Sequence, residues 1–334
     1  MYPLGKQFEI DVSKAKSDDK CTYKGNHYRI TILSERLVRL EYSPSGTFAD
    51  LPSQFAFNRY FNFPEYNVKQ DNKFLEITTK YFKLTYVKEA PFTGSKVDPM
   101  KNLKITLFMG GRENDRDWYY GHPEVRNLGG NMISEDVNTP KVLKRGLYSL
   151  EGFASIDDSN SLLFNSDGTL ETREKGSLDI YVFMYKDDFS LAMKDYFHLT
   201  GNPELIPRYA LGNWWSRNTT YNEESVKEIV SDFERRNVPL AVFLLDRDWH
   251  YRNVGNAKNL HTGFTFNKEL FPDPSEISKF LHGHNIRLGL EIDPTEGIYP
   301  HETYYSQACS YLGINGNKII AFDPLNPKLL DVYF

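Results

Sequence analysis

The spacing of apolar residues changes near residue 200, and this change limits the possible folds of the chain more than any other feature. Before it, short segments rich in Val, Ile, Leu, Tyr and Phe alternate with breaks rich in Asn, Asp, Ser and Gly. Strands joined by tight turns have this composition, and no helical period separates them. We therefore predict an antiparallel β-sandwich domain over residues 1–205. The expected strands lie in HYRITIL, LVRLEY, KFLEITTKYFKLTYV, LKITLFMG, LYSLEGFASI, SLLFNSDG and SLDIYVFMY.

Strand and helix patterns alternate after residue 205. The segment NEESVKEIVSDFERRN places its apolar residues on one helical face and starts at Asn222, a typical helix cap. A second helix is predicted to follow Asp273 as its cap, with Pro274 in the first position and Glu276 closing an arrangement like a capping box. The expected strands between helices are ALGNWWS, LAVFLLD, IRLGLEID and IIAFD, and a third helix is expected from about His301.

Alternating strands and helices require parallel strand pairing with crossover helices. Continuous apolar strands such as LAVFLL are buried on both faces, which fits a doubly wound sheet or an eight-fold barrel. Both architectures keep their chemistry at the carboxyl ends of the strands. These ends are rich in acids and Trp and contain no Gly-rich phosphate loop, which disfavours a nucleotide-binding protein and favours a carbohydrate pocket. The strand ends are NWWSRN, DRDWHYRN, EIDPTEG and FDPLNP.

The second part of the chain is short for a complete barrel. An eight-fold barrel needs roughly 250 residues. We therefore predict that residues 206–334 form the first part of a (β/α)8 TIM barrel, and that the chain is the front portion of a longer polypeptide. A partial barrel leaves strand edges unpaired, so we expect the remainder of the barrel as a partner, from a missing C-terminal part or a second chain.

The composition argues against several partners and locations. With 40 Lys and Arg against 45 Asp and Glu, the net charge of −5 attracts neither nucleic acid nor a membrane surface. The N-terminus lacks a secretory pattern and no apolar run reaches transmembrane length, so we expect a soluble cytoplasmic protein. Cys21 and Cys309 are expected to be free thiols. His282 and His284 are expected at the surface, and we expect neither a metal nor a cofactor.

A series of motifs follows in one order from about residue 120 to the end of the chain. They are RNLGGN (126–131), LEGFASIDDSNSLLFNSDG (150–168), PRYALGNWWSRN (207–218), VPLAVFLLDRDWH (238–250), FPDP (271–274) and EIDPTEGIYPHE (291–302). Together they resemble glycoside hydrolase family 31, which contains α-glucosidases and α-xylosidases. The resemblance implies a β-sandwich followed by a (β/α)8 barrel. It also implies an enzyme that hydrolyses terminal α-linked sugars of small glycosides or oligosaccharides with retention of configuration.

The resemblance further implies roles for residues at the strand ends. Asp246 matches the acid that hydrogen-bonds sugar hydroxyls at the end of the second barrel strand. By analogy Asp293, at the end of the third strand, lines the same pocket. Trp214, Trp249 and His250 are expected as walls of this pocket or as supports behind them.

The catalytic residues are expected outside this sequence. The family uses one aspartate as nucleophile and another as acid/base, about 5 to 5.5 Å apart. In relatives both follow the fourth barrel strand, so here they would fall beyond Phe334, and the chain alone is expected to be inactive. Arg247 is a separate candidate, because a cation beside the sugar-binding acid could select a particular hydroxyl or an anionic substituent.

Simpler explanations exist for the same residues. Asp246 and Asp248 could form ion pairs with a neighbouring arginine, and two acids two apart on a strand project to the same side. Asp293 could cap a turn, and His301 and Glu302 could cap a helix. The alternative function is a non-catalytic sugar-binding or structural protein that retains the scaffold.

Overall fold

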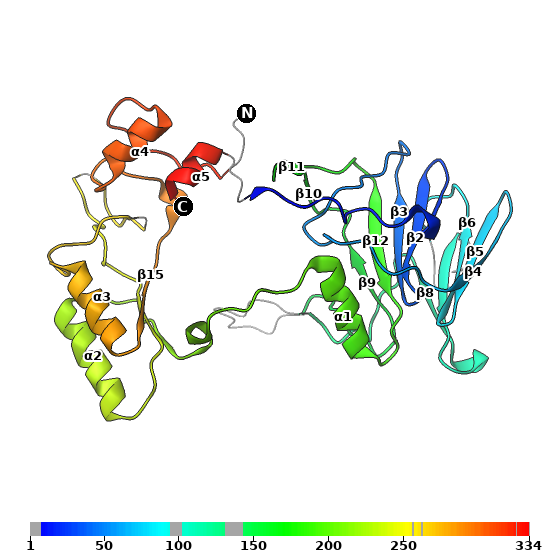
Figure 1. Cartoon of the computed structure of the whole chain (residues 1–334), viewed down its shortest axis with the longest axis horizontal. Helices are drawn as coiled ribbons and strands as arrows, with labels where there is room; N and C mark the ends of the chain where they lie inside the picture. The colour runs from blue at the N-terminus through cyan, green and yellow to red at the C-terminus, as the bar shows by residue number, and fades with distance from the viewer. Residues whose placement is uncertain are drawn as a thin grey trace. The chain divides into compact units, whose positions relative to one another are not determined.

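The computed structural model of the chain describes residues 8–93, 102–130, 143–255, 257–261, 263–324 and 326–333 (Figure 1). One structural unit spans Lys6–Pro203 and another contains Glu204–Phe334. Asn131, the last residue of the motif RNLGGN, lies outside the described residues. Cys21 and Cys309 are both free, as predicted. Among the described residues, the structure contains no helix with the length and apolar character needed to cross a lipid bilayer.

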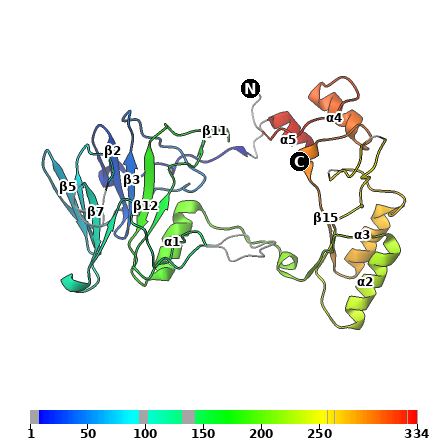
Figure 2. The ribbon, with the colours of Figure 1, turned by 180° about the vertical axis from the view of Figure 1, so that it is seen from behind.

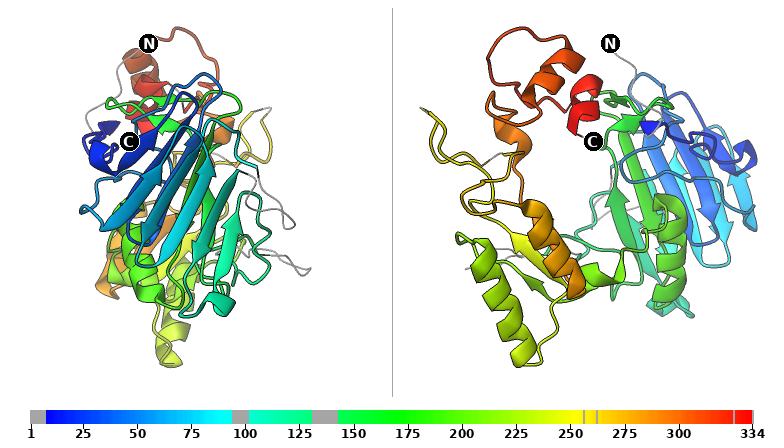
Figure 3. Two further views of the ribbon diagram at one scale, coloured as in Figure 1. Left: turned by 90° about the vertical axis from the view of Figure 1, so that its right-hand side faces the viewer. Right: turned by 60° about the vertical axis from the view of Figure 1, so that its left-hand side comes forward.

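The first unit contains two five-stranded antiparallel sheets and a two-stranded ribbon, which confirms the predicted sandwich (Figures 2 and 3). One shared core lies against both sheets, and it includes Ile30 and Leu40 from one sheet and Leu84 and Ile105 from the other. The first sheet has the order β1 (Thr22–Lys24), β2 (Tyr28–Ser34), β3 (Leu37–Tyr42), β12 (Leu178–Phe183) and β9 (Ala154–Asp157). The second has the order β4 (Tyr66–Gln70), β5 (Phe74–Thr79), β6 (Phe82–Val87), β7 (Leu103–Leu107) and β8 (Arg116–Tyr119). The ribbon pairs β10 (Leu163–Phe164) with β11 (Leu170–Glu171).

Helix α1 (Phe189–Thr200) ends the first unit, where only strands were expected. Asp188 caps it by accepting a hydrogen bond from the backbone N–H of Leu191 at 3.2 Å. Ala192 and Leu199, seven positions apart, are buried and fall on one helical face. Short 3-10 turns lie at η2 (Asp19–Cys21) and η3 (Arg112–Asn114) in this unit, and at η4 (Arg208–Leu211) and η5 (Pro294–Glu296) in the other.

The second unit contains a parallel sheet with the order β13 (Trp214–Trp215), β14 (Val242–Leu245) and β15 (Arg287–Leu290). Helix α2 (Glu223–Arg235) connects β13 to β14, and helix α3 (Pro274–Gly283) lies between β14 and β15 in the chain. Alternating parallel strands and helices confirm the predicted start of a barrel. Its core includes Val226, Val230, Phe243, Leu245, Trp249, Phe271, Ile277, Leu281 and Ile286. Helices α4 (Tyr305–Leu312) and α5 (Pro327–Tyr333) follow.

The helix starts follow local capping chemistry. Asn222 caps α2 through a capping box, because its side chain accepts from the Ser225 N–H at 2.8 Å while the Ser225 hydroxyl accepts from the Asn222 N–H at 2.9 Å. Asp273 caps α3 with Pro274 in the first turn, as predicted. Glu276 takes no part in a capping box: the Asp273 side chain accepts from the Ser275 N–H, and Glu276 forms an exposed ion pair with Lys279 at 3.1 Å.

Among the described residues, the segment IIAFD does not form the predicted fourth parallel strand, so this prediction is wrong. In the segment IIAFD, Ile320 makes an isolated antiparallel bridge with Ile298, through two N–H to O hydrogen bonds of 2.9 Å. These bonds use both backbone groups of Ile320, so this residue cannot extend the parallel ladder from β15. The helix expected from about His301 begins at Tyr305.

Candidate sugar-binding site

Acidic side chains directly follow two neighbouring parallel strands. Asp246 comes after the last residue of β14, and Glu291 comes after the last residue of β15. Leu245 and Leu290 are paired in the ladder, and the Glu291 N–H donates to the Leu245 carbonyl at 3.0 Å. The sheet therefore brings both acids to its carboxyl edge, where α/β folds place their binding sites.

The Asp246 carboxylate is held by one oxygen only. Its Oδ2 accepts hydrogen bonds from the Ser216 hydroxyl at 2.8 Å and from the Arg217 N–H at 2.7 Å. Its Oδ1 is buried and has no hydrogen-bond partner within the described structure. A buried carboxylate oxygen without a donor is costly unless a ligand or water supplies one. The carboxylate of Asp246 is therefore held in one orientation, and its Oδ1 is free to accept a hydrogen bond from a ligand.

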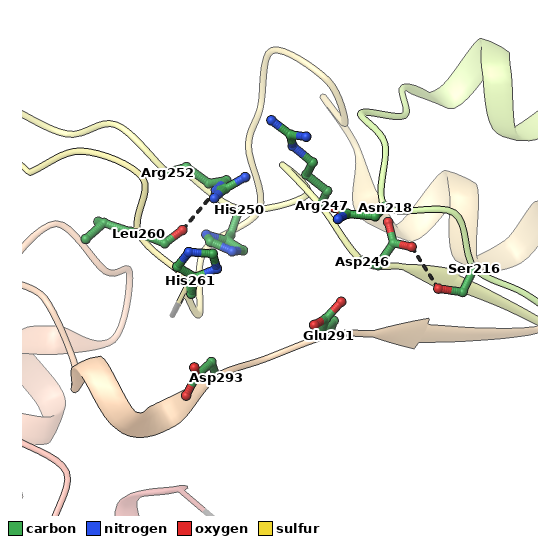
Figure 4. A pocket seen from close by; sticks show the side chains of 10 residues that line it. All are labelled: Ser216, Asn218, Asp246, Arg247, His250, Arg252, Leu260, His261, Glu291 and Asp293. Carbon is green, nitrogen blue, oxygen red and sulfur yellow. Dashed lines mark hydrogen bonds between the residues drawn. The ribbon is translucent and has the colours of Figure 1, made fainter. Parts of the chain in front are cut away.

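A pocket of about 520 Å³ lies over this edge. Figure 4 shows Asp246, Glu291 and Asp293 along the strand ends, with His250, Arg252 and His261 on the segment that follows β14. Nine of the ten lining residues are polar or charged, and Leu260 is the one aliphatic member. The lining residues are Ser216, Asn218, Asp246, Arg247, His250, Arg252, Leu260, His261, Glu291 and Asp293.

Asp293 lines the pocket and also caps a turn, so both expectations for it apply. Its Oδ1 accepts from the Thr295 N–H at 2.9 Å and from the Thr295 hydroxyl at 2.5 Å. These two hydrogen bonds lower the pKa of the Asp293 carboxyl below its ordinary value, because they stabilise the charged form. The carboxylate oriented by η5 can therefore act as a second acceptor.

His250 is buried in the pocket wall, with 4% of its surface exposed. Burial lowers the pKa of its imidazole, which favours the neutral ring. Gly263 packs directly on this ring, because a Cβ at that position would lie 2.4 Å from His250 ring atoms. A neutral imidazole can both donate and accept hydrogen bonds, which suits a hydroxyl-bearing ligand.

Neither predicted tryptophan lines the pocket. Trp249 is buried in the core, and its indole N–H donates to the Glu291 carbonyl at 2.9 Å, so it supports the end of β15 from behind. Trp214 is 48% exposed and donates its indole N–H to the Ala210 carbonyl at 3.1 Å. Trp249 was expected either as a wall of the pocket or as a support behind it, and its position fits the support.

Two arginines contribute to the rim of the pocket. The Arg247 guanidinium lies 3.3 Å from Asp248 Oδ2, and the Arg252 guanidinium lies 3.6 Å from Asp248 Oδ1. Arg252 also donates to the Leu260 carbonyl at 3.0 Å.

The expectation that Asp246 and Asp248 project to the same side of a strand is wrong, because β14 ends at Leu245 and Asp248 has a left-handed backbone with φ of 57°.

Sequence reasoning missed several lining residues, and Glu291 is the clearest of them. A usable signal existed for Glu291, because it follows the apolar run IRLGL in the same way that Asp246 follows LAVFLL. Arg252, Leu260 and His261 come from an irregular segment after β14, where no periodicity indicates which side chains face the pocket. Within the described residues, no group of three or more His, Cys, Asp or Glu side chains could hold a metal ion.

The same region matches a known family. Residues 203–325 match the model described as the glycosyl hydrolases family 31 TIM-barrel domain. Residues 203–325 therefore belong to the TIM-barrel domain of glycosyl hydrolase family 31. Similar proteins include an α-xylosidase from Saccharolobus solfataricus, 28% identical over 198 residues, which cover 56% of this chain and 25% of that protein. Another is α-glucosidase 2 from Bacillus thermoamyloliquefaciens, 32% identical over 150 residues, which cover 43% of this chain and 18% of that protein.

Solved structures of family 31 enzymes share the fold. An α-xylosidase from Xanthomonas citri superimposes with a TM-score of 0.57 at 14% identity, over 93% of this chain and 54% of the other. A dextranase from Flavobacterium johnsoniae, complexed with glucose, superimposes with a TM-score of 0.55 at 17% identity, over 86% of this chain and 38% of the other. The chain thus spans about a quarter or less of the two curated relatives and about half or less of these two structures.

Proposed function

We propose that the chain carries part of the sugar-binding pocket of a retaining α-glycoside hydrolase that acts on terminal α-linked sugars of small glycosides or oligosaccharides. The main support for this proposal is the hydrogen bonding of the Asp246 carboxylate. One of its oxygens is fixed by Ser216 and Arg217, and the other is buried without a donor within the described structure. A sugar hydroxyl supplies the missing donor.

The chemistry of the lining supports a neutral polyhydroxylated ligand. Asp246, Glu291 and Asp293 offer carboxylate acceptors, while Arg247 and Arg252 offer donors. A hydroxyl group can donate and accept, so a sugar ring can satisfy both kinds of side chain at once. The family 31 dextranase was solved with glucose, which is consistent with this ligand class.

The catalytic step belongs to the whole protein in this proposal. Retaining glycosidases place a nucleophile and an acid/base about 5 to 5.5 Å apart across the scissile bond. We propose that these two carboxylates follow a later barrel strand, beyond Phe334, and that Asp246 binds the sugar and takes no part in bond cleavage. The remainder of the barrel is then the partner that completes the site.

The test is hydrolysis of aryl α-glucosides and α-xylosides by the full-length polypeptide that contains this chain. We expect product to form first as the α-anomer, observed by proton NMR. Asp246→Asn should reduce kcat/KM by roughly 10- to 150-fold, the loss of a hydrogen bond to a charged group.

The control is Asp71→Asn, which alters an exposed turn carboxylate of the sandwich. Unchanged turnover in Asp246→Asn would refute the role of Asp246. Sugar binding without any turnover by the full-length protein would instead support the non-catalytic sugar-binding alternative.

A further inference from the structure

We infer that Asp248 is a positioning residue of the proposed sugar site, which holds the guanidinium groups of Arg247 and Arg252 at the rim of the pocket. This inference rests on the proposed function. Asp248 itself does not line the pocket, whereas both arginines do. It therefore acts on a ligand only through them.

The contacts of Asp248 tie together segments that follow two different strands. Its Oδ2 accepts from the hydroxyl of Thr220, which lies on the segment after β13, and is 3.3 Å from the Arg247 Nε. Its Oδ1 lies 3.6 Å from an Arg252 terminal nitrogen. One carboxylate thus faces one hydroxyl and two guanidinium groups.

The backbone at Asp248 explains how its side chain reaches these partners. Its φ of 57° lies in the left-handed region, which Asp and Asn adopt more readily than other side chains. This conformation turns the chain after β14, so that Asp246 faces the pocket while Asp248 faces the arginines. Asn at position 248 should keep this turn and still accept from Thr220, while it removes the charge.

The two arginines depend on Asp248 to different degrees. Within the described residues, the Arg247 side chain has no other ion pair, and 46% of it is exposed. Arg252 is also fixed by the Leu260 carbonyl at 3.0 Å, and 16% of it is exposed. Loss of the Asp248 charge should therefore release Arg247 more than Arg252, and the two like charges should then move apart.

A matched control exists on the surface of α2. Asp232 also pairs with two arginines, with Arg236 at 2.7 Å and with Arg235, but none of these residues lines the candidate site. Asp232→Asn removes the same charge from the same type of cluster. It separates an effect on the pocket from a general effect on charge or stability.

The experiment compares the wild type, Asp248→Asn and Asp232→Asn in two measurements, the first on this chain and the second on the full-length polypeptide that contains it. The first is the NMR signal of the arginine Nε–H groups, which reports whether each guanidinium is held. The second is the affinity for methyl α-D-glucoside and methyl α-D-xyloside, from saturation-transfer NMR titrations. In Asp248→Asn we expect the Arg247 signal to shift and broaden more than that of Arg252, and the affinity to fall about two- to fivefold.

The outcomes separate this inference from the proposed function. Wild-type binding together with unchanged affinity or an unchanged Arg247 signal in Asp248→Asn overturns the role of Asp248. Absence of binding by the wild type to either glycoside refutes the sugar site, and the Arg247 signal then still decides whether Asp248 holds the arginine. If Asp248→Asn does not fold, Thr220→Val removes the hydroxyl that orients the carboxylate, and the same two measurements apply.

Discussion

Asp246 and Glu291 occupy equivalent positions on adjacent strands, yet only Asp246 was predicted. Asp246 was indicated by its place after an apolar strand and by the resemblance to family 31. At the next strand end the resemblance indicated Asp293, two residues further on, although Glu291 is the first residue after β15. The pairing of Leu245 with Leu290 makes the two first residues neighbours, and strand register is not visible in a single sequence.

The burial of His250 makes the free energy of unfolding depend on pH, and the sign follows from the lowered pKa of its imidazole. Burial lowers its pKa in the folded chain, whereas in the unfolded chain the imidazole protonates near pH 6.5. As the pH falls from 7 to 5, the unfolded state takes up a proton before the folded state does, so the free energy of unfolding decreases. His250→Asn should lose less stability than the wild type over this range, measured by urea unfolding at both pH values.

The control for this prediction is His282→Asn, because His282 is exposed on α3. It should lose as much stability between pH 7 and 5 as the wild type. An equal loss in His250→Asn and the wild type would contradict the assigned effect of burial.

At the scale of elements, the features that could be predicted are those set by residues close together in the sequence. The starts of α2 and α3 were predicted because Asn222 and Asp273 cap their own helices through contacts two or three residues away. Helix α1 was not predicted, although Asp188 marks its start. The segment IIAFD has strand composition, but its pairing with Ile298 depends on a distant residue that composition does not reveal.

The irregular segment after β14 is attached to the segment after β15 by hydrogen bonds in which backbone N–H groups donate to side-chain oxygens. The buried Glu302 accepts from the Phe264 N–H at 3.1 Å, and Thr265 accepts from the Thr303 N–H at 2.8 Å. Glu296 accepts from the His261 N–H at 2.9 Å. These bonds hold the segment that carries His261 over the pocket.

Glu302→Ala should therefore loosen this segment. We expect hydrogen exchange at the Phe264 amide to accelerate, because its acceptor is lost, while amides of α2 keep their protection. Hydrogen-exchange mass spectrometry or NMR measures this change. Glu276→Ala, which removes only an exposed ion pair with Lys279, should leave Phe264 unchanged; equal acceleration in both variants would argue against the attachment.

At the scale of the molecule, both units expose large apolar side chains, but the described part of the second unit exposes more of them although it is the smaller unit. The first unit has a core shared by two complete sheets. The second unit has a three-stranded parallel sheet and several exposed apolar side chains. Parallel sheets are usually covered on both faces and closed or extended at their edges. The exposed residues include Leu205, Ile206, Leu211, Trp214, Tyr304 and Tyr311.

This difference predicts unequal behaviour of the separated units. A polypeptide of residues 8–203 should fold alone and unfold cooperatively, because its core is its own. A polypeptide of residues 204–333 should bind the dye ANS and associate at micromolar concentration, because its apolar side chains are uncovered. Thermal unfolding and light scattering measure these properties; a monomeric second unit without dye binding would contradict the prediction.

The bridge between Ile298 and Ile320 has a consequence for how further strands could join this sheet. Strand β15 pairs with β14 on one side, and within the described residues no strand pairs with its other side. Ile320 is held by only two backbone hydrogen bonds. An exchange of these two bonds for two bonds to β15 would conserve their number, so the step from an antiparallel contact to a fourth parallel strand would require little net change in hydrogen bonding.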